Sequence, residues 1–258
     1  MNQQIDEMIS PEEISVDSFD VKDSLNSRFW NEEQQLDIYI RRALLVIAKD
    51  FIDEYNLGEY VIDDIIITGS LANYNWNEEF SDVDLHIIMD TTQLSEDPSL
   101  AKSISDAMRN LWNKTHTDIS VGGFPVELYI QDTHEPHKSS GVYSLLDGEW
   151  KTSPSLDKLS GEIEEDEIKT RVAEYMNIID EIEKVYNKIE PLKMYHICSK
   201  LMDKIKAERT SGLARLSNDD AAELTTGNLI FKSLRRSGHI EKLIDIKRRC
   251  FDRARSIK

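Results

Sequence analysis

Residues Ile65–Asp90 read IIITGSLANYNWNEEFSDVDLHIIMD. An apolar run breaks at Gly69-Ser70, passes into a polar loop and resumes as a second apolar run that carries two carboxylates. Asp82 and Asp84 are two residues apart, and on a strand this spacing places both side chains on one face. Two carboxylates that face the same way repel each other unless a cation lies between them or one is protonated. The stretch therefore predicts a divalent metal site with oxygen ligands.

The surrounding pattern indicates an α+β fold. Amphipathic helices are expected from about Asn31 to Tyr55 and from Ser99 to Thr117, because apolar residues recur there at spacings of three and four. Asp147-Gly148 suits the turn of a hairpin over residues 142–151. Runs rich in β-branched and apolar residues predict three strands, at Val61–Thr68, Phe80–Met89 and Phe124–Gln131.

The second half of the chain has a different character. From Ser160 onward the apolar residues follow a helical period, and Ser217–Asp220 reads as a helix cap. The helices are expected at Glu162–Ile189, Leu192–Thr210, Leu229–Arg236 and Ile240–Arg255. We therefore expect an α/β half followed by an all-helical C-terminal domain. The expected regions are an acidic, partly ordered segment over residues 1–27, an α/β domain over 28–155 and a helical domain over 156–258.

A Gly-Ser turn after a strand, an Asp-x-Asp on the next strand and a carboxylate on a later strand occur here in that order. They are Gly69-Ser70, Asp82-Val83-Asp84 and Glu127. The arrangement resembles the signature of the polymerase-beta-like nucleotidyltransferase superfamily over Ile65–Gln131, and the chain looks most like small stand-alone members found in large bacterial viruses and prokaryotes. The resemblance implies that residues 28–155 form a catalytic domain built on a mixed sheet flanked by helices. It would transfer a nucleoside monophosphate from an NTP to a hydroxyl acceptor and release pyrophosphate.

The resemblance also implies roles for the motif residues. Asp82 and Asp84 would bind two Mg²⁺ ions, for which Mn²⁺ can substitute, and Glu127 would bind the catalytic ion and help to deprotonate the acceptor. Hard cations prefer oxygen ligands, and two of them can activate the attacking oxygen and stabilise the leaving one. Gly69 and Ser70 would hold the triphosphate, because a residue without a Cβ lets the backbone approach a phosphate closely.

The Gly-Ser turn departs from the family pattern in one respect. Family members often carry a basic residue after the Ser, whereas Leu71–Tyr74 contains none. From Leu229 to the end of the chain there are ten Lys and Arg against three Asp and Glu, although the whole chain has a net charge of −18. Lys232, Arg235 and Arg236 are therefore candidate triphosphate ligands. A face that meets a nucleic acid and an ordinary solvated helix face are the alternatives.

Other polar and aromatic residues near the motif are secondary candidates. His86 shares a strand face with Asp84, where it either borders the metals or only packs. Tyr74 and Trp76 either stack on a base or cover the core. The loop after the third strand either reaches the nucleotide or is an ordinary exposed loop, and its candidates are His134, His137, Lys138 and Ser139.

Composition narrows the function classes. The charge of −18 and a pI near 4.7 argue against general binding of duplex DNA. No run of residues approaches about 18 uncharged apolar positions, so we expect no membrane span. The N-terminus does not read as a secretory signal. We expect a cytoplasmic protein, in the host cytoplasm if a virus encodes it. Cys198 and Cys250 are expected to be buried thiols rather than a disulfide.

The residues leave the acceptor open. A small molecule, a particular RNA or a protein each fits. The rival from another class is a catalytically silent module on the same fold, which would bind a nucleotide or a partner as an antitoxin or regulator does. Three acids in one cleft argue against that rival, because they are hard to explain without a metal.

Overall fold

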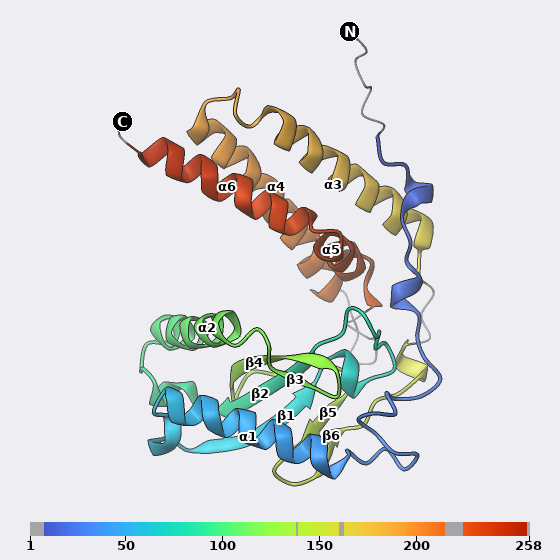
Figure 1. The fold of residues 1–258 in the computed structure, drawn as a ribbon, viewed down its shortest axis with the longest axis vertical. Helices are drawn as coiled ribbons and strands as arrows, with labels where there is room; N and C mark the ends of the chain where they lie inside the picture. The colour runs from blue at the N-terminus through green and yellow to red at the C-terminus, as the bar shows by residue number, and fades with distance from the viewer. Residues whose placement is uncertain (1–7, 138, 160–162, 215–223, 257–258) are drawn as a thin grey trace. The chain divides into compact units, whose positions relative to one another are not determined.

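The computed structural model describes residues 8–137, 139–159, 163–214 and 224–256 (Figure 1). The chain divides into two compact units. The sheet unit is Asp20–Ser160, and the helical unit joins Met1–Phe19 to Gly161–Lys258. The expected regions had their boundaries at residues 27 and 155, and the two units divide at residues 19 and 160.

The sheet unit is built around one mixed sheet of six strands. Their order across the sheet is β3-β4-β2-β1-β5-β6. The neighbouring strands β2 and β4 run parallel, and every other neighbouring pair is antiparallel. The strands are β1 (Ile62–Thr68), β2 (Val83–Met89), β3 (Ser120–Val121), β4 (Phe124–Asp132), β5 (Val142–Ser144) and β6 (Glu149–Thr152). The expected α+β class, the three expected strands and the hairpin β5–β6 are confirmed, with shifted ends.

The start of β2 differs from the expectation of Phe80. The strand begins at Val83, so Asp82 lies immediately before it. The Asn77 side chain accepts hydrogen bonds from the backbone N–H groups of Glu79 and Phe80, at 2.9 and 3.2 Å, and closes a local turn. An Asn side chain that bonds to the following backbone competes with strand pairing. Residues 80–82, which the sequence had assigned to the strand, therefore precede it.

One face of the sheet supplies the core of this unit. Val83, Leu85, Ile87 and Met89 alternate along β2 and are fully buried. Two helices accompany the sheet, α1 (Ile38–Glu54), which contacts β2, and α2 (Pro98–Thr115), which contacts β4. Each begins at an aspartate whose carboxylate accepts N–H groups of the first turn, which is the usual way to satisfy a helix start. In Figure 1, α1 lies across the sheet.

The helical unit packs four helices and the N-terminal segment around a second core. The described helices are α3 (Glu165–Val185), α4 (Pro191–Ala214), α5 (Thr226–Arg236) and α6 (His239–Arg255). Val16 and Phe19 are buried among the apolar residues of these helices. Asn177 holds the segment to α3 through two hydrogen bonds with the backbone of Ile9, at 2.9 and 2.8 Å. Figure 1 shows this blue segment beside α3.

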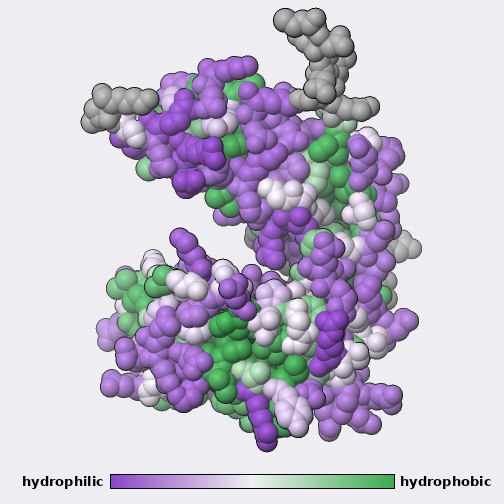
Figure 2. Space-filling model, viewed as in Figure 1, coloured by the Kyte–Doolittle hydropathy of each residue, from purple (hydrophilic) through white to green (hydrophobic). Residues whose placement is uncertain are grey.

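The surface of the helical unit reflects the amphipathic pattern of its helices. Figure 2 shows mostly hydrophilic residues on its visible face. Within the described ranges, no helix is both long and apolar enough to cross a membrane. The predicted cap at Ser217–Asp220 lies outside the described residues.

Gly141 offers a test of how tightly the sheet unit is packed. Its carbonyl accepts a hydrogen bond from the Thr68 hydroxyl at 3.1 Å, and a Cβ on residue 141 would lie 1.9 Å from the carbonyl oxygen of Ala72. Because that neighbour is backbone, Gly141→Ala forces both segments apart. We expect it to lower the free energy of unfolding by about 1–3 kcal/mol in urea denaturation. Gly58→Ala is the control, since no heavy atom lies within 4 Å of its Cβ position. Equal stability of the two variants would contradict the packing.

The two thiols offer a second test. Cys198 and Cys250 are free and fully buried in the helical core, and burial raises the pKa of Cys198 to about 11. An unfolded thiol ionises near pH 8.5. The folded state therefore keeps a proton that the unfolded state loses, and this part of the stability is complete below about pH 8.5 and declines as the pH rises toward 11. We expect Cys198→Ala to reduce the fall in the free energy of unfolding between about pH 8.5 and 11. We also expect the thiols of the native protein to resist alkylation by iodoacetamide at about pH 8. Rapid alkylation of the folded protein would show that the thiols are accessible.

Candidate active site

The predicted carboxylates meet where three strands lie in register. Asp84 of β2 pairs with Glu127 of β4 on one side and with Thr68 of β1 on the other. Residues opposite each other on neighbouring strands place their side chains on the same face. Asp84 and Glu127 are therefore neighbours on the face opposite the apolar core, although 42 residues of sequence separate them.

Asp82 completes the set from the loop end of the same strand. All three carboxylates are partly buried. Burial, followed by the negative charges of Asp84, Glu127 and Asp82, raises the pKa of the Tyr129 phenol, so each of the three acids lies within electrostatic reach of this hydroxyl.

Aromatic side chains border the acids on the same face. The Tyr129 hydroxyl donates to Glu127 Oε2 at 2.5 Å. The His86 ring stacks on the Tyr129 ring with 4.7 Å between centroids, and His86 Nδ1 lies 2.8 Å from Gln131 Oε1. Burial lowers the pKa of His86 to about 4, so the imidazole is neutral at pH 7. His86, which the sequence left between a metal-bordering and a packing role, packs against Tyr129 here.

The Gly69-Ser70 turn lies directly against Asp84, one of the predicted metal ligands. Gly69 has φ 73° and ψ −157°, a backbone region that is essentially restricted to glycine. A Cβ at this position would lie 1.8 Å from Asp84 Oδ2. Ser70 Oγ lies 2.8 Å from Ser81 Oγ, which also accepts the N–H of Asn77 at 2.9 Å. The absence of a Cβ thus makes room for Asp84, and the hydroxyl predicted to bind phosphate is hydrogen-bonded across the loop.

The remaining secondary candidates divide between packing and loop contacts. Tyr74 is buried, and its hydroxyl accepts from Gln34 Nε2 at 3.0 Å. Trp76 Nε1 donates to the Ser24 carbonyl at 2.9 Å. Tyr74 is therefore part of the core, whereas Trp76 is partly exposed and bonds to the neighbouring backbone. In the loop after β4, His134 is exposed, His137 lies against Gln131, Ser139 bonds to Gly141, and Lys138 lies outside the described residues.

Two residues of this neighbourhood were missed in the sequence. Tyr129 follows Glu127 at the two-residue spacing that places both on one strand face, and this signal could have identified it. Arg109 comes from α2 and lies 5.4 Å from the centroid of the Tyr129 ring. No sequence pattern links Arg109 to the motif, because only the packing of α2 beside β4 brings it there.

The donor set suits a hard divalent cation, although the side chains do not form a finished cage. Within the described residues, no three His, Cys, Asp or Glu side chains are grouped so that they could hold a metal ion together. The three acids offer oxygen donors, which are the ligands that Mg²⁺ and Mn²⁺ prefer. One of these oxygens, Glu127 Oε2, accepts the Tyr129 hydroxyl. The oxygen donors of Asp82, Asp84 and Glu127 match the preference of Mg²⁺, and their role as its ligands stays a prediction.

The charge of the sheet unit bears on what can bind there. Residues 20–160 contain 26 Asp and Glu against 11 Lys and Arg, which is most of the net −18 of the chain. A triphosphate that enters this unit meets a repulsive field unless cations accompany it. Because no basic residue follows Ser70, the Gly69-Ser70 turn itself would also need added cations to bind a triphosphate.

The predicted C-terminal cations lie on α5. Arg236 Nη1 donates to the Ser18 hydroxyl at 2.6 Å, and its guanidinium lies 4.2 Å from the centroid of the Phe19 ring. Arg236 therefore anchors the N-terminal segment within the helical unit. Lys232 is partly buried and Arg235 is exposed on the same helix. A role of these three residues in binding triphosphate stays a prediction.

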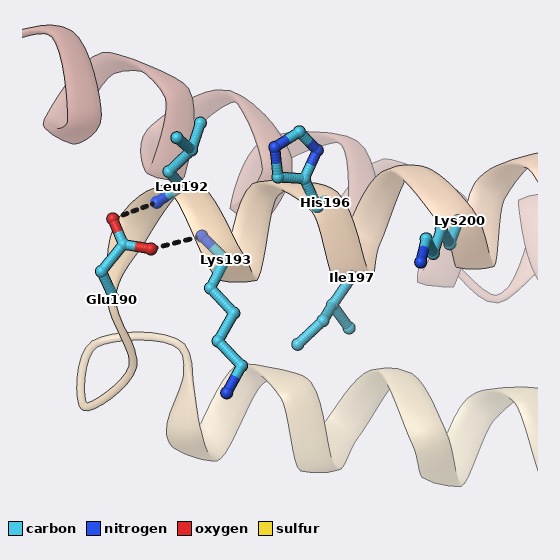
Figure 3. Close-up of a pocket in the computed structure, with 6 residues that line it drawn as sticks. All are labelled: Glu190, Leu192, Lys193, His196, Ile197 and Lys200. Carbon is cyan, nitrogen blue, oxygen red and sulfur yellow. Dashed lines mark hydrogen bonds between the residues drawn. The ribbon is translucent and has the colours of Figure 1, made fainter.

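A cavity of about 460 Å³ at the start of α4 does not have the character of the site described above. Figure 3 shows that the Glu190 carboxylate accepts the N–H groups of Leu192 and Lys193, at 2.9 and 2.6 Å. The helix start is thus already satisfied by an anion of the chain itself. The cavity is lined by Glu190, Leu192, Lys193, His196, Ile197 and Lys200.

Comparisons with known proteins give little further support. No family model matches the chain, and no curated protein matches it either. Among solved structures, a STING-associated CdnE c-di-GMP synthase from Capnocytophaga granulosa was found, with 13% sequence identity over 85% of this chain and 84% of that chain and a TM-score of 0.23. A likeness at this TM-score carries no argument, and the functional proposal depends on the residues described above.

The contact between Gly69 and Asp84 can be tested by stability. We expect Gly69→Ala to destabilise the fold by about 1–3 kcal/mol from backbone strain alone, with a further loss from the clash with the carboxylate. Asp84→Ala removes the atoms that a Cβ would meet. The double variant should therefore lose less stability in urea denaturation than the two single losses added together. Strict additivity would show that the two residues do not touch.

Proposed function

We propose that this protein is a metal-dependent nucleotidyltransferase of the EC 2.7.7 type, which moves a nucleoside monophosphate from an NTP to a hydroxyl acceptor and releases pyrophosphate. The observation that carries the proposal is the side-by-side placement of Asp84 and Glu127 on β2 and β4, with Asp82 one residue ahead of β2. The contact of the Gly69 backbone with Asp84 supports it, because it links the predicted phosphate turn to the predicted metal ligands.

Each acid has a distinct part in the proposed reaction. Asp82 and Asp84 hold the cations, and bound Mg²⁺ or Mn²⁺ would supply charge neutralisation and polarise phosphate oxygens. Glu127 would orient the acceptor hydroxyl and take its proton, and the hydrogen bond from Tyr129 to one of its two oxygens supports this role. Gly69 and Ser70 form the turn nearest the acids, and the proposal keeps them as the place of the triphosphate.

Further cations are needed for the triphosphate, since the sheet unit is strongly acidic. We assign Lys232, Arg235 and Arg236 of α5 as candidates for this role. The acidic surplus also disfavours a long duplex as the acceptor. A small molecule, a particular RNA or a protein side chain fits the proposal, in a cytoplasmic setting.

The proposal predicts transfer that depends on two carboxylates. We expect the wild type to incorporate label from α-labelled NTPs in the presence of Mg²⁺ and a panel of acceptors, and chelation by EDTA to abolish the labelling. Asp82→Ala/Asp84→Ala should lose it by at least about 1,000-fold, because metal and substrate charge can no longer be held together.

The matched control removes two exposed carboxylates from the same unit. Asp50→Ala/Asp118→Ala changes the net charge by the same amount and should keep full labelling. Equal labelling by the wild type and the Asp82/Asp84 double variant would sink the proposal. If calorimetry showed NTP binding with Mg²⁺ but no acceptor supported turnover, a silent nucleotide-binding module would be favoured instead.

A further inference from the structure

Tyr129 and Glu127 are joined by a short hydrogen bond along β4. The two residues are two positions apart, so both project from the same face of the strand. The distance from the Tyr129 hydroxyl oxygen to Glu127 Oε2 is 2.5 Å. A glutamate side chain has three rotatable bonds, and a hydrogen bond of this kind to a carboxylate selects one arrangement of them.

The Tyr129 ring is itself restrained by neighbours from two other elements. His86 on β2 stacks on it at 4.7 Å with an angle of 24° between the rings, and Arg109 on α2 lies 5.4 Å from its centroid. His86 is in turn held by Gln131, with 2.8 Å between Nδ1 and Oε1. These contacts fix the position of the Tyr129 ring and therefore of its hydroxyl. The hydrogen bond to Glu127 then also fixes the position of the carboxylate.

The hydroxyl remains a donor at neutral pH. An ordinary tyrosine phenol ionises only at about pH 10, and Glu127 Oε2 lies at hydrogen-bond distance from it. A protonated phenol donates, whereas a phenolate would repel the carboxylate. Glu127 Oε2 is thereby occupied, and Oε1 is the oxygen that can meet a metal ion or an acceptor hydroxyl.

We propose that Tyr129 is a positioning residue. It fixes the Glu127 carboxylate so that Oε1 faces Asp84 on the neighbouring strand β2. The inference rests on the proposed function, because it concerns the third carboxylate of the same site. The Gly-Ser, Asp-x-Asp and Glu motif does not include this residue. It arises from the tyrosine at the second position after Glu127 and from its packing between β2 and α2.

The direct test is the affinity for Mn²⁺, measured by electron paramagnetic resonance of the unbound ion in the absence of NTP. Tyr129→Phe keeps the ring and its stacking and removes only the hydroxyl. Loss of an outer partner of a metal ligand typically weakens metal binding by about 10–100-fold, and we expect an effect of this size. In the transfer assay, kcat should fall while KM for the NTP stays near the wild-type value, because the acceptor contact is affected rather than the triphosphate.

Tyr143→Phe is the matched control. It also removes one tyrosine hydroxyl from the sheet unit, where Tyr143 donates to the Gly148 carbonyl at 2.7 Å. We expect Mn²⁺ affinity and kcat to be unchanged. An equal loss in both variants would show that any missing hydroxyl in this unit weakens the fold, and it would overturn the specific role of Tyr129.

A double-mutant cycle separates positioning from general packing. If Tyr129 acts through Glu127, then Tyr129→Phe should have no further effect on Mn²⁺ affinity in a Glu127→Gln background. Full additivity would overturn the inference. Arg109→Gln provides a second variant in case Tyr129→Phe does not fold, since it leaves the hydroxyl in place and loosens the ring. Arg109→Gln should weaken Mn²⁺ binding less than loss of the hydroxyl does. Wild-type Mn²⁺ affinity in that variant would count against the positioning role of Tyr129.

The experiments distinguish this inference from the proposed function. A wild-type protein that binds no Mn²⁺ and transfers no nucleotide contradicts both. A wild-type protein that does both, with Tyr129→Phe equal to it in Mn²⁺ affinity and kcat, contradicts only the positioning role.

Discussion

The Asp84 carboxylate lies against the backbone of Gly69, and this contact exists only because residue 69 lacks a Cβ. The site depends on it in two ways. The turn after β1 lies against Asp84 at the start of β2, and it has the unusual backbone angles that Gly69 permits. The same contact places the predicted phosphate turn beside the predicted metal ligand, so that one glycine joins the two halves of the motif. A side chain at this position would push apart the elements that the chemistry requires together.

A second constraint is electrostatic. The face of the sheet that carries Asp84, Glu127 and Tyr129 lies opposite the fully buried face of β2, so burial on one side stabilises a strand that bears like charges on the other. The Tyr129 hydroxyl meets one carboxylate oxygen, which offsets a part of the repulsion. The rest of the unit is acidic and offers little general compensation. Binding of cations at this face would relieve the repulsion, and this is the physical basis of the proposed metal dependence.

The helical unit shows how a charged segment can serve structure rather than chemistry. The acidic N-terminal segment looked partly ordered in the sequence, yet residues 8–19 pack on the helices through Val16 and Phe19. Arg236, which the sequence had suggested for phosphate, also has a structural contact, because it bonds to Ser18 and covers Phe19. A basic count along the chain does not distinguish an internal anchor from a ligand-binding group, because the distinction depends on which residues lie opposite.

The sequence alone determined the three longest strands, the hairpin, the amphipathic helices and the order of the Gly-Ser, Asp-x-Asp and Glu motif, because these depend on local periodicity and on residue type. It did not predict the two-residue strand β3. It did not determine the start of β2, where the Asn77 side chain closes a turn that periodicity does not report. Only the tertiary structure decided that β4 lies parallel to β2 and pairs Glu127 with Asp84, since strand order and register arise from contacts distant in sequence. The tertiary structure likewise brought Arg109 and His86 to Tyr129, because packing against β4 has no signature in the chain.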